Sequence, residues 1–147
     1  MRYIDGLREA RESSNPHGKS RPRGSKAAGL AFERKVGKKL LLATHNPWFE
    51  FSDRNGRGFC SPDYVIVREK WLVVLECKLT SVAEAREQLL FLYKPVLEHV
   101  YKLPMRGIIV VKNAPGLGLR IAEDFLEAET LANGSPSILH WLGSGPL

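Results

Sequence analysis

Two short apolar runs, at residues 64–67 and 71–75, stand on either side of the charged tripeptide 68–70. Both runs are rich in β-branched and aromatic residues, which favour strands. The pattern therefore predicts a β-hairpin with a tight connection at the tripeptide. If the connection is centred between Glu69 and Lys70, Asp63 lies opposite Glu76 on the neighbouring strand.

Side chains alternate between the two faces of a strand, so the residues of the hairpin divide between two faces. One face carries Asp63, Val65, Val67, Leu72, Val74, Glu76 and Lys78, and the other carries Tyr64, Ile66, Trp71, Val73, Leu75 and Cys77. Both faces are mostly apolar, which predicts a central sheet covered by helices on both sides. Three charges then lie on a face that is otherwise buried.

Burying Asp63 and Glu76 together is costly unless positive charge compensates them, and Lys78 neutralises only one of the two. A divalent cation would supply the rest, and Mg²⁺ prefers carboxylate oxygens together with water and phosphate. This chemistry suits phosphodiester hydrolysis, with Lys78 stabilising the attacking hydroxide. The alternative is structural: Asp63 begins a strand after a Pro turn, and Glu76 pairs with Lys78 without binding a metal ion.

Helical spacing of apolar residues predicts a helix from about Ala27 to Ala43, with Ser25 as its cap. Glu33 borders the buried face of this helix, where its carboxylate could reach the metal site. Exposed lysines give the helix a basic outer face.

Residues 48–53 read as the first strand, and residues 54–58 as a turn. Arg54 and Arg57 in that turn are expected one strand from the metal, where they could hold a phosphate. Glu50 and Asp53 rank below Glu33 as a third acid.

A capping box of Ser81 and Glu84 opens a helix that runs towards Lys102 and is kinked by Pro95. Gln88 lies near its first turns, where it could orient a water molecule or a phosphate. Residues 107–112 form the next strand, and residues 120–132 a short acidic helix. Residues 138–142 are expected to form an edge strand or a dimer contact.

Pro62-Asp63, followed by Glu76-Cys77-Lys78 on an apolar strand, resembles the motif of the PD-(D/E)XK nuclease superfamily over roughly residues 28–112. The resemblance implies a restriction-endonuclease-like α/β fold, an αβββαβ core with a central mixed sheet flanked by helices. It also implies a helical Glu before the hairpin and a Gln after it, which Glu33 and Gln88 provide. Some members have a Gln and a Tyr four residues apart, whereas Tyr93 follows Gln88 by five, which favours a core role for Tyr93.

The length of 147 residues suits one domain, expected at residues 28–147 after a flexible basic arm at residues 1–27. The net charge of +6 favours an anionic partner such as nucleic acid. Besides the turn arginines, the expected DNA contacts are Arg21, Arg23 and Lys26 of the arm and Arg86 of the helix after the hairpin. The alternative is that the arm is a solvated tail with no role.

No apolar run is long enough to span a membrane, and the N-terminus lacks the apolar core of a signal peptide. We therefore expect a soluble, cytoplasmic protein. Cys60 and Cys77 lack metal-binding spacing and are interpreted as free thiols. A zinc site that combines them with His45 and His99 is a less favoured alternative.

These observations together predict a Mg²⁺-dependent deoxyribonuclease, with Mn²⁺ able to substitute. Asp63, Glu76 and Glu33 would hold the metal, and Lys78 and Gln88 would complete the catalytic set. Small size and a basic arm favour structure-directed cutting of DNA in recombination, repair or phage DNA processing, as in Holliday-junction resolvases, which would call for a homodimer. RNA remains open as a substrate, and so does a non-catalytic nucleic-acid-binding or assembly protein on the same fold.

Overall fold

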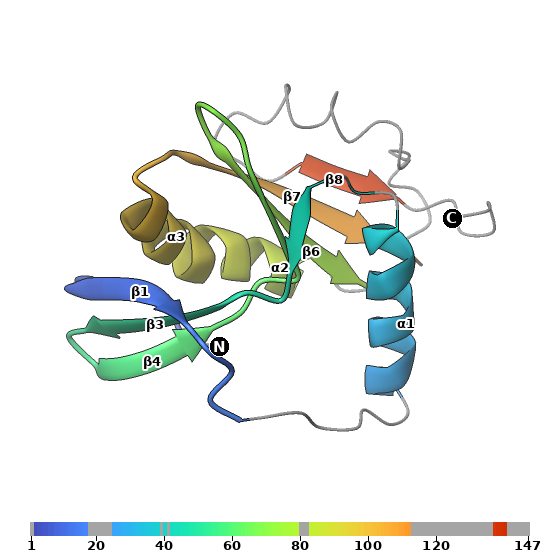
Figure 1. Ribbon diagram of the computed structural model, residues 1–147. Helices are drawn as coiled ribbons and strands as arrows, with labels where there is room; N and C mark the ends of the chain where they lie inside the picture. The colour runs from blue at the N-terminus through green and yellow to red at the C-terminus, as the bar shows by residue number, and fades with distance from the viewer. Residues whose placement is uncertain are drawn as a thin grey trace.

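The computed structural model describes residues 2–17, 25–38, 40, 42–79, 83–112 and 137–140. These residues form an α/β fold with two sheets (Figure 1). In chain order the elements are β1 (Glu9–Ser13), α1 (Ser25–Gly37), β2 (Ala43–His45), β3 (Trp48–Asp53), β4 (Gly56–Cys60), β5 (Tyr64–Val67), β6 (Leu72–Lys78), α2 (Ala83–Gln88), the π-helical turn η1 (Leu89–Tyr93), α3 (Lys94–Tyr101), β7 (Met105–Val111) and β8 (Ser137–His140).

The larger sheet has the strand order β2-β5-β6-β7-β8 and is mixed. Strands β5 and β6 form the predicted antiparallel hairpin, and Tyr64 pairs with Leu75 in the expected register. Strand β7 then runs parallel to β6, and β8 runs parallel to β7 at the edge. The predicted register and the edge position of the last strand are both confirmed.

Both faces of the larger sheet are covered, as the two apolar faces of the hairpin predicted. On one face, Phe32 and Val36 of α1 pack against a cluster that includes Ile66 and Val73. On the other face, helices α2 and α3 pack against a cluster that includes Val65 and Val74. Alternate residues of β5, β6 and β7 therefore enter different cores. Val67 at the end of β5 is the exception, because its side chain is 54% exposed.

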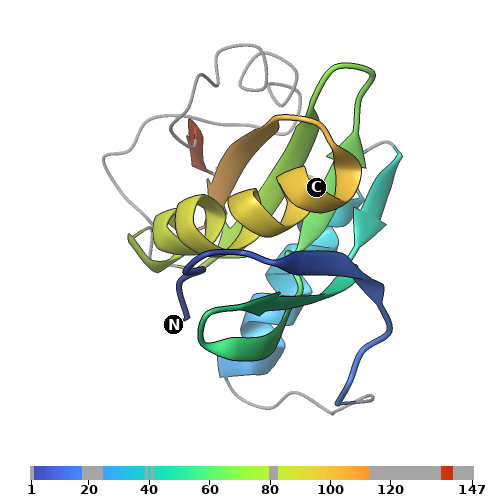
Figure 2. The same cartoon turned by 90° about the vertical axis from the view of Figure 1, so that its left-hand side faces the viewer.

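The smaller sheet is antiparallel, with the order β1-β3-β4. Figure 2 shows it beside the helical segment α2 to α3, which lies between it and the larger sheet. Phe49 and Phe51 of β3 are fully buried and join the same core as Val65 and Leu89. The two sheets thus share one apolar core through this helical segment.

The prediction of a flexible arm over residues 1–27 is wrong where the structure describes that stretch. Residues 9–13 form β1, which pairs with β3 along its whole length. Ile4, Leu7 and Ala10 pack against the core, so this stretch contains enough apolar area to be ordered. Helix α1 also begins at Ser25, inside the expected arm. Residues 18–24 lie outside the described part.

Two other boundaries differ from the predictions. Helix α1 ends at Gly37, six residues before the expected end, and Ala43 belongs to strand β2. The expected turn at residues 54–58 is shorter, because Gly56–Cys60 forms strand β4. The Arg and Gly residues of β4 have little strand propensity. The strand forms because it pairs with β3.

The helical segment after the hairpin is continuous over residues 83–101 and changes its winding once. The π-helical turn η1 ends immediately before α3, and Pro95 occupies the first turn of α3. A proline has no N–H to offer the preceding turn, so the local rewinding and Pro95 occur together. Ser81 and the expected helix at residues 120–132 lie outside the described residues.

None of the described helices is long and apolar enough to cross a membrane.

Candidate active site

The candidate site begins where one long hairpin bends from the smaller sheet into the larger one. His45 pairs with Tyr64 at the end of the β2–β5 ladder. Continuing this register brings Pro47 opposite Pro62, and two residues further along comes the β3–β4 pair of Phe49 with Cys60. The register is therefore unbroken, and the two prolines, which have no N–H, lie at the bend.

Asp63 follows Pro62 at this bend and faces Glu76 across the strands, as the hairpin register predicted. The backbone N–H of Asp63 donates to Oε1 of Glu76 at 3.0 Å. In return, the backbone N–H of Cys77 donates to Oδ2 of Asp63 at 2.7 Å. Each carboxylate is thus held by a backbone group of the opposite strand, which fixes both side chains.

Glu33 comes from α1 and joins the same cluster, as the sequence predicted. Its carboxyl group is hydrogen-bonded to that of Asp63 and to the side chain of Asn46. The helix is held close to β5, because the Tyr64 hydroxyl donates to the Glu33 carbonyl oxygen at 2.9 Å. Gly37 permits this approach, since a Cβ atom at that position would lie 2.0 Å from the Tyr64 hydroxyl oxygen.

All three carboxyl groups have raised pKa values. Burial raises the pKa of Asp63 to about 8, together with the charge and hydrogen bond of Glu33. Glu76 is 3% exposed, and burial followed by the charge of Asp63 raises its pKa well above the ordinary value. Burial also raises the pKa of Glu33. Three acids that disfavour their charged forms in one place are typical of a functional site.

Lys78 is the positive charge nearest to this pair along β6. It lies two residues after Glu76, so the two side chains leave the strand on the same side. Its charge lowers the pKa values of both Asp63 and Glu76 and so partly offsets the effect of burial. The end of β6 is anchored by the Lys112 N–H, which donates to the Lys78 carbonyl oxygen at 3.0 Å.

Gln88 ends helix α2, and its side-chain oxygen Oε1 is buried without a hydrogen-bond partner among the residues that the structure describes. A buried acceptor that lacks a donor costs free energy, so this oxygen is suited to receive a hydrogen bond from a ligand or water. The predicted role of Gln88 in orienting a water molecule or a phosphate stays a prediction.

Tyr93 was interpreted as a core residue, and the structure adds a second role. Its ring is buried, and its hydroxyl donates to the Ser61 carbonyl oxygen at 3.3 Å. The same hydroxyl also lies near Glu76 and can donate its one hydrogen to that carboxyl instead, which lowers the pKa of Glu76. The π-helical turn η1 inserts one residue between Gln88 and Tyr93, so a spacing of five aligns them as a spacing of four would in an α-helix.

His45 and Asn46 also reach the cluster, and sequence reasoning had not placed them there. The His45 ring contacts the Glu33 carboxyl and stacks on the Tyr64 ring at 4.8 Å between centroids. Burial lowers the pKa of His45, so at neutral pH this contact is a hydrogen bond of a neutral ring. The only sequence signal was that residue 45 pairs with residue 64 once β2 is identified.

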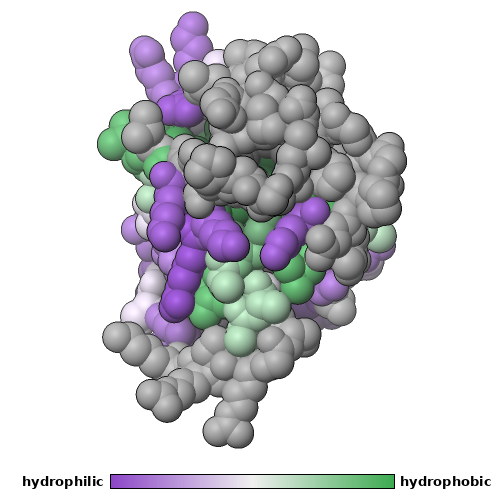
Figure 3. Space-filling view, turned by 90° about the vertical axis from the view of Figure 1, so that its right-hand side faces the viewer, coloured by the Kyte–Doolittle hydropathy of each residue, from purple (hydrophilic) through white to green (hydrophobic). Residues whose placement is uncertain are grey.

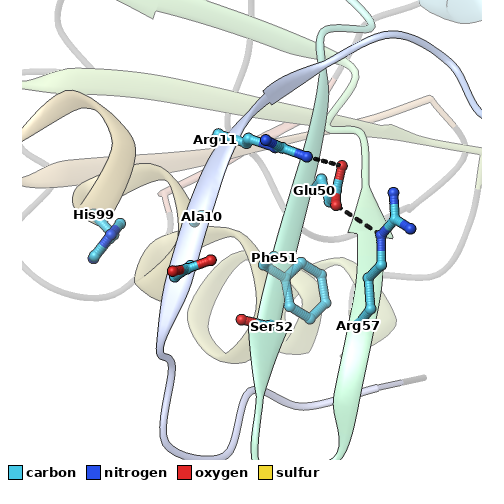
Figure 4. Close-up of a pocket in the computed structure, with 8 residues that line it drawn as sticks. Ala10, Arg11, Glu50, Phe51, Ser52, Arg57 and His99 are labelled. Carbon is cyan, nitrogen blue, oxygen red and sulfur yellow. Dashed lines mark hydrogen bonds and ion pairs between the residues drawn. The ribbon is translucent and has the colours of Figure 1, made fainter.

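Of the two arginines expected in the turn, Arg57 lies in β4 of the smaller sheet and Arg54 lies in the turn before it. Arg57 pairs with Glu50 at 2.7 Å, and Arg54 pairs with Asp5 at 3.3 Å. Figure 4 shows Glu50 between Arg11 and Arg57 in a cavity of about 490 Å³. Each predicted phosphate ligand therefore already has a carboxylate partner, Arg57 within the smaller sheet and Arg54 in the segment before β1.

The remaining predicted nucleic-acid contacts fall into two groups. Arg86 is exposed on α2, as are Arg34 and Lys35 on α1. Figure 3 shows one face of the molecule, on which hydrophilic side chains lie beside an apolar area. Arg21 and Arg23 lie outside the described residues, and the side chain of Lys26 is not described either.

The spare carboxylates and the zinc alternative are not part of the cluster. Asp53 is buried and accepts hydrogen bonds from Arg2 and from the Asp5 and Asn55 N–H groups. Both cysteines are free thiols, and they lie in different cores on opposite faces of the larger sheet. The proposed zinc site of Cys60, Cys77, His45 and His99 is therefore wrong, because His99 lines the cavity of the smaller sheet.

Within the described residues, no three His, Cys, Asp or Glu side chains already converge as a set of metal ligands. Asp63, Glu76 and Glu33 offer carboxylate oxygens in one place, and sharing a cation would require their side chains to reorient. Hard oxygen donors of this kind suit Mg²⁺ or Mn²⁺.

No family model matches the chain, and no curated protein matches it.

Proposed function

We propose that this protein is a divalent-cation-dependent deoxyribonuclease whose active site contains Asp63, Glu76, Glu33 and Lys78. The observation that carries the proposal is that three carboxyl groups with raised pKa values lie near one another and near a lysine, although they are not yet arranged as metal ligands. They come from a helix, a strand and a bend between strands, so they meet only in the fold. A purely structural role gives no reason to bury these charges together.

The order of elements supports a restriction-endonuclease-like core. Without the smaller sheet, the chain reads α1, β2, β5, β6, the helical segment α2 to α3, and β7, which is an αβββαβ order. Strands β3 and β4 are then the outer half of the hairpin that β2 and β5 begin. In this interpretation Asp63 and the Glu76-Cys77-Lys78 segment occupy the positions of the superfamily motif.

Asp63, Glu76 and Glu33 would hold Mg²⁺ or Mn²⁺, and the chemistry of their oxygens fits such an ion. When bound, the cation would polarise the phosphodiester and make a water molecule more acidic. Because the three pKa values are raised, binding the cation would also release protons from these groups.

Lys78 and Gln88 have complementary tasks in this proposal. The Lys78 ammonium group would donate hydrogen bonds to the attacking oxygen and offset its negative charge. The Gln88 Oε1 atom, for which the described part of the chain offers no donor, would accept a hydrogen bond from the same water and so orient it. Tyr93 is a positioning residue, since its hydroxyl contacts Glu76 and not the reacting atoms.

The preference for DNA rests on charge. The net charge of +6 and the exposed basic residues on α1 and α2 favour a polyanion. Two narrower versions of this function are structure-directed cutting of DNA junctions or flaps and cleavage of RNA, and a panel of substrates separates them. Symmetric cutting of a junction would call for a homodimer. A non-catalytic nucleic-acid-binding protein is the alternative that the same panel tests.

The decisive experiment measures cleavage of labelled linear duplex, single-stranded, flap and four-way-junction DNA, and of single-stranded RNA, with Mg²⁺, Mn²⁺ or a chelator. Asp63→Asn and Lys78→Ala are compared with Glu69→Gln and Lys70→Ala, which change exposed residues of the hairpin connection. We expect cation-dependent cleavage that the first two variants lose and the controls keep. Binding without cleavage, unchanged by chelator, would establish the non-catalytic alternative.

A further inference from the structure

A second cavity, of about 720 Å³, opens beside the carboxylate cluster. Asn46 and Tyr93 line this cavity and also contact the cluster, Asn46 through Glu33 and Tyr93 through Glu76. Its volume falls within the roughly 300–1,000 Å³ typical of ligand pockets. One part of the cavity wall therefore belongs to the proposed active site.

Aromatic rings dominate the described part of this wall. His17, Trp48, Phe59 and Tyr93 all line the cavity. The His17 and Trp48 rings meet edge to face at 6.0 Å between centroids, and Phe59 carries the Arg57 guanidinium over its face at 5.1 Å. Flat rings that line a cavity are suited to stacking nucleic-acid bases.

Polar groups complete the wall. Asn15 and Asn46 also line it, Asn15 accepting from the His17 N–H at 2.8 Å and Asn46 contacting Glu33. A side-chain amide has both a donor and an acceptor group for the edge of a base. Ser61 also lines the cavity, and its hydroxyl oxygen is buried without a hydrogen-bond partner in the described residues. An unpartnered hydroxyl among aromatic rings is an indication that a polar ligand completes the site.

We propose that this cavity binds one unpaired nucleobase of the substrate strand and places the adjoining phosphodiester at the carboxylate cluster. The inference rests on the proposed function, since it names the form of nucleic acid that the site accepts. A base in a duplex is stacked and paired, so it can enter only from a single strand, a flap or a junction, or after leaving the helix. The substrate class is therefore single-stranded or locally unpaired nucleic acid.

The test measures binding of fluorescein-labelled oligonucleotides of equal length in chelator: a single strand, a single strand of abasic residues, and a duplex. Wild type is compared with Trp48→Ala, Trp48→Phe and Phe91→Ala, the last an exposed aromatic residue that packs on Tyr3 instead of lining the cavity. We expect Trp48→Ala to weaken single-strand binding about 5- to 100-fold, as stacking contributions predict. Trp48→Phe and Phe91→Ala should stay within about threefold of wild type.

Abasic strands and duplex should bind more weakly than the normal strand and should not respond to Trp48→Ala. If Trp48→Ala does not fold, as judged by circular dichroism, Phe59→Leu takes its place. Equal binding of all three nucleic acids, or equal loss in Phe91→Ala, overturns the base-binding proposal.

Measuring cleavage of the same strands distinguishes a failure of the base-binding proposal from a failure of the proposed nuclease function. Cleavage of every substrate without base dependence overturns the pocket and leaves the nuclease intact. Base-dependent binding without cleavage supports the pocket and overturns the hydrolytic function.

Discussion

The backbone N–H of Ile4 donates to the carbonyl oxygen of Phe91 at 3.0 Å. In an α-helix that oxygen would accept from the N–H four residues later, but residue 95 is a proline and has none. The N-terminal segment therefore supplies the donor that Pro95 cannot provide. This relationship explains why the first residues of the chain are ordered on the helical segment.

Ile4→Ala tests that docking. Ile4 packs against the core, so its truncation should lower the free energy of unfolding by about 1–2 kcal/mol, less than for a fully buried side chain. Arg8→Ala removes an exposed side chain of the same segment and should change the free energy of unfolding by less than about 0.5 kcal/mol. Urea unfolding gives both values. A mobile arm would make the two variants indistinguishable from wild type.

Gly37→Ala should move α1 away from the larger sheet. The new Cβ atom would lie 2.0 Å from the Tyr64 hydroxyl oxygen, so we expect a loss of roughly 1–3 kcal/mol in the free energy of unfolding. Gly29→Ala is the matched control in the same helix, with no atom within 4 Å of the new Cβ, and should stabilise by up to about 1 kcal/mol. Thermal unfolding distinguishes them, and equal effects would contradict the described approach of α1 to β5.

Stability in chelator should fall as the pH rises. The pKa of Asp63 is raised from 3.8 to about 8 in the folded state, so the folded protein binds more protons than the unfolded chain between these values. The stabilisation is complete below about pH 4 and is lost progressively up to about pH 8. Asp63→Asn should flatten this slope, whereas Glu69→Gln should keep it. A wild-type slope of the opposite sign would contradict the burial of these acids.

Divalent cation should reverse that trend. Mg²⁺ or Mn²⁺ competes with protons for the same carboxylates, so it should raise the thermal midpoint more at pH 8 than at pH 5. A cation concentration of about 100 times the dissociation constant would raise the free energy of unfolding by about 2.7 kcal/mol. Glu33→Gln should reduce the shift, and Glu9→Gln, an exposed residue of β1, should not. Identical shifts in these two variants would remove Glu33 from the metal site.

Tyr93→Phe tests the positioning of Glu76. Without the hydroxyl, Glu76 loses a hydrogen bond that lowers its pKa, so its pKa should rise. We expect the acidic limb of the pH–rate profile to move to higher pH, with a fall in kcat of about tenfold and little change in KM. Tyr101→Phe, whose hydroxyl contacts Glu12 instead, is the control. An unchanged profile would leave Tyr93 with only a core role.

The hairpin could be predicted from the sequence because both of its strands alternate between two apolar cores. That alternation determines the register, and the register alone brings Asp63 opposite Glu76. For the hairpin, local periodicity carries the information needed. For Glu33, periodicity gave only its position beside the buried stripe of α1, and the resemblance to the nuclease superfamily pointed it towards the site.

The smaller sheet could not be predicted in the same way. Strand β1 is Glu-Ala-Arg-Glu-Ser and β4 contains two glycines, so neither has strand propensity, and both depend on pairing with β3. The role of Tyr93 was missed for a related reason. An α-helical spacing was assumed, whereas the π-helical turn before Pro95 changes the phase by one residue.

The facing prolines 47 and 62 have a consequence for how the chain can vary in length. One register runs through both halves of the bent hairpin, so adding or deleting two residues in β3 and the two opposite them in β4 leaves Asp63 opposite Asn46 and facing Glu76. A single insertion in one strand alone would turn every following side chain to the other face. Proteins that share this site should therefore tolerate balanced changes in the outer hairpin and resist unbalanced ones.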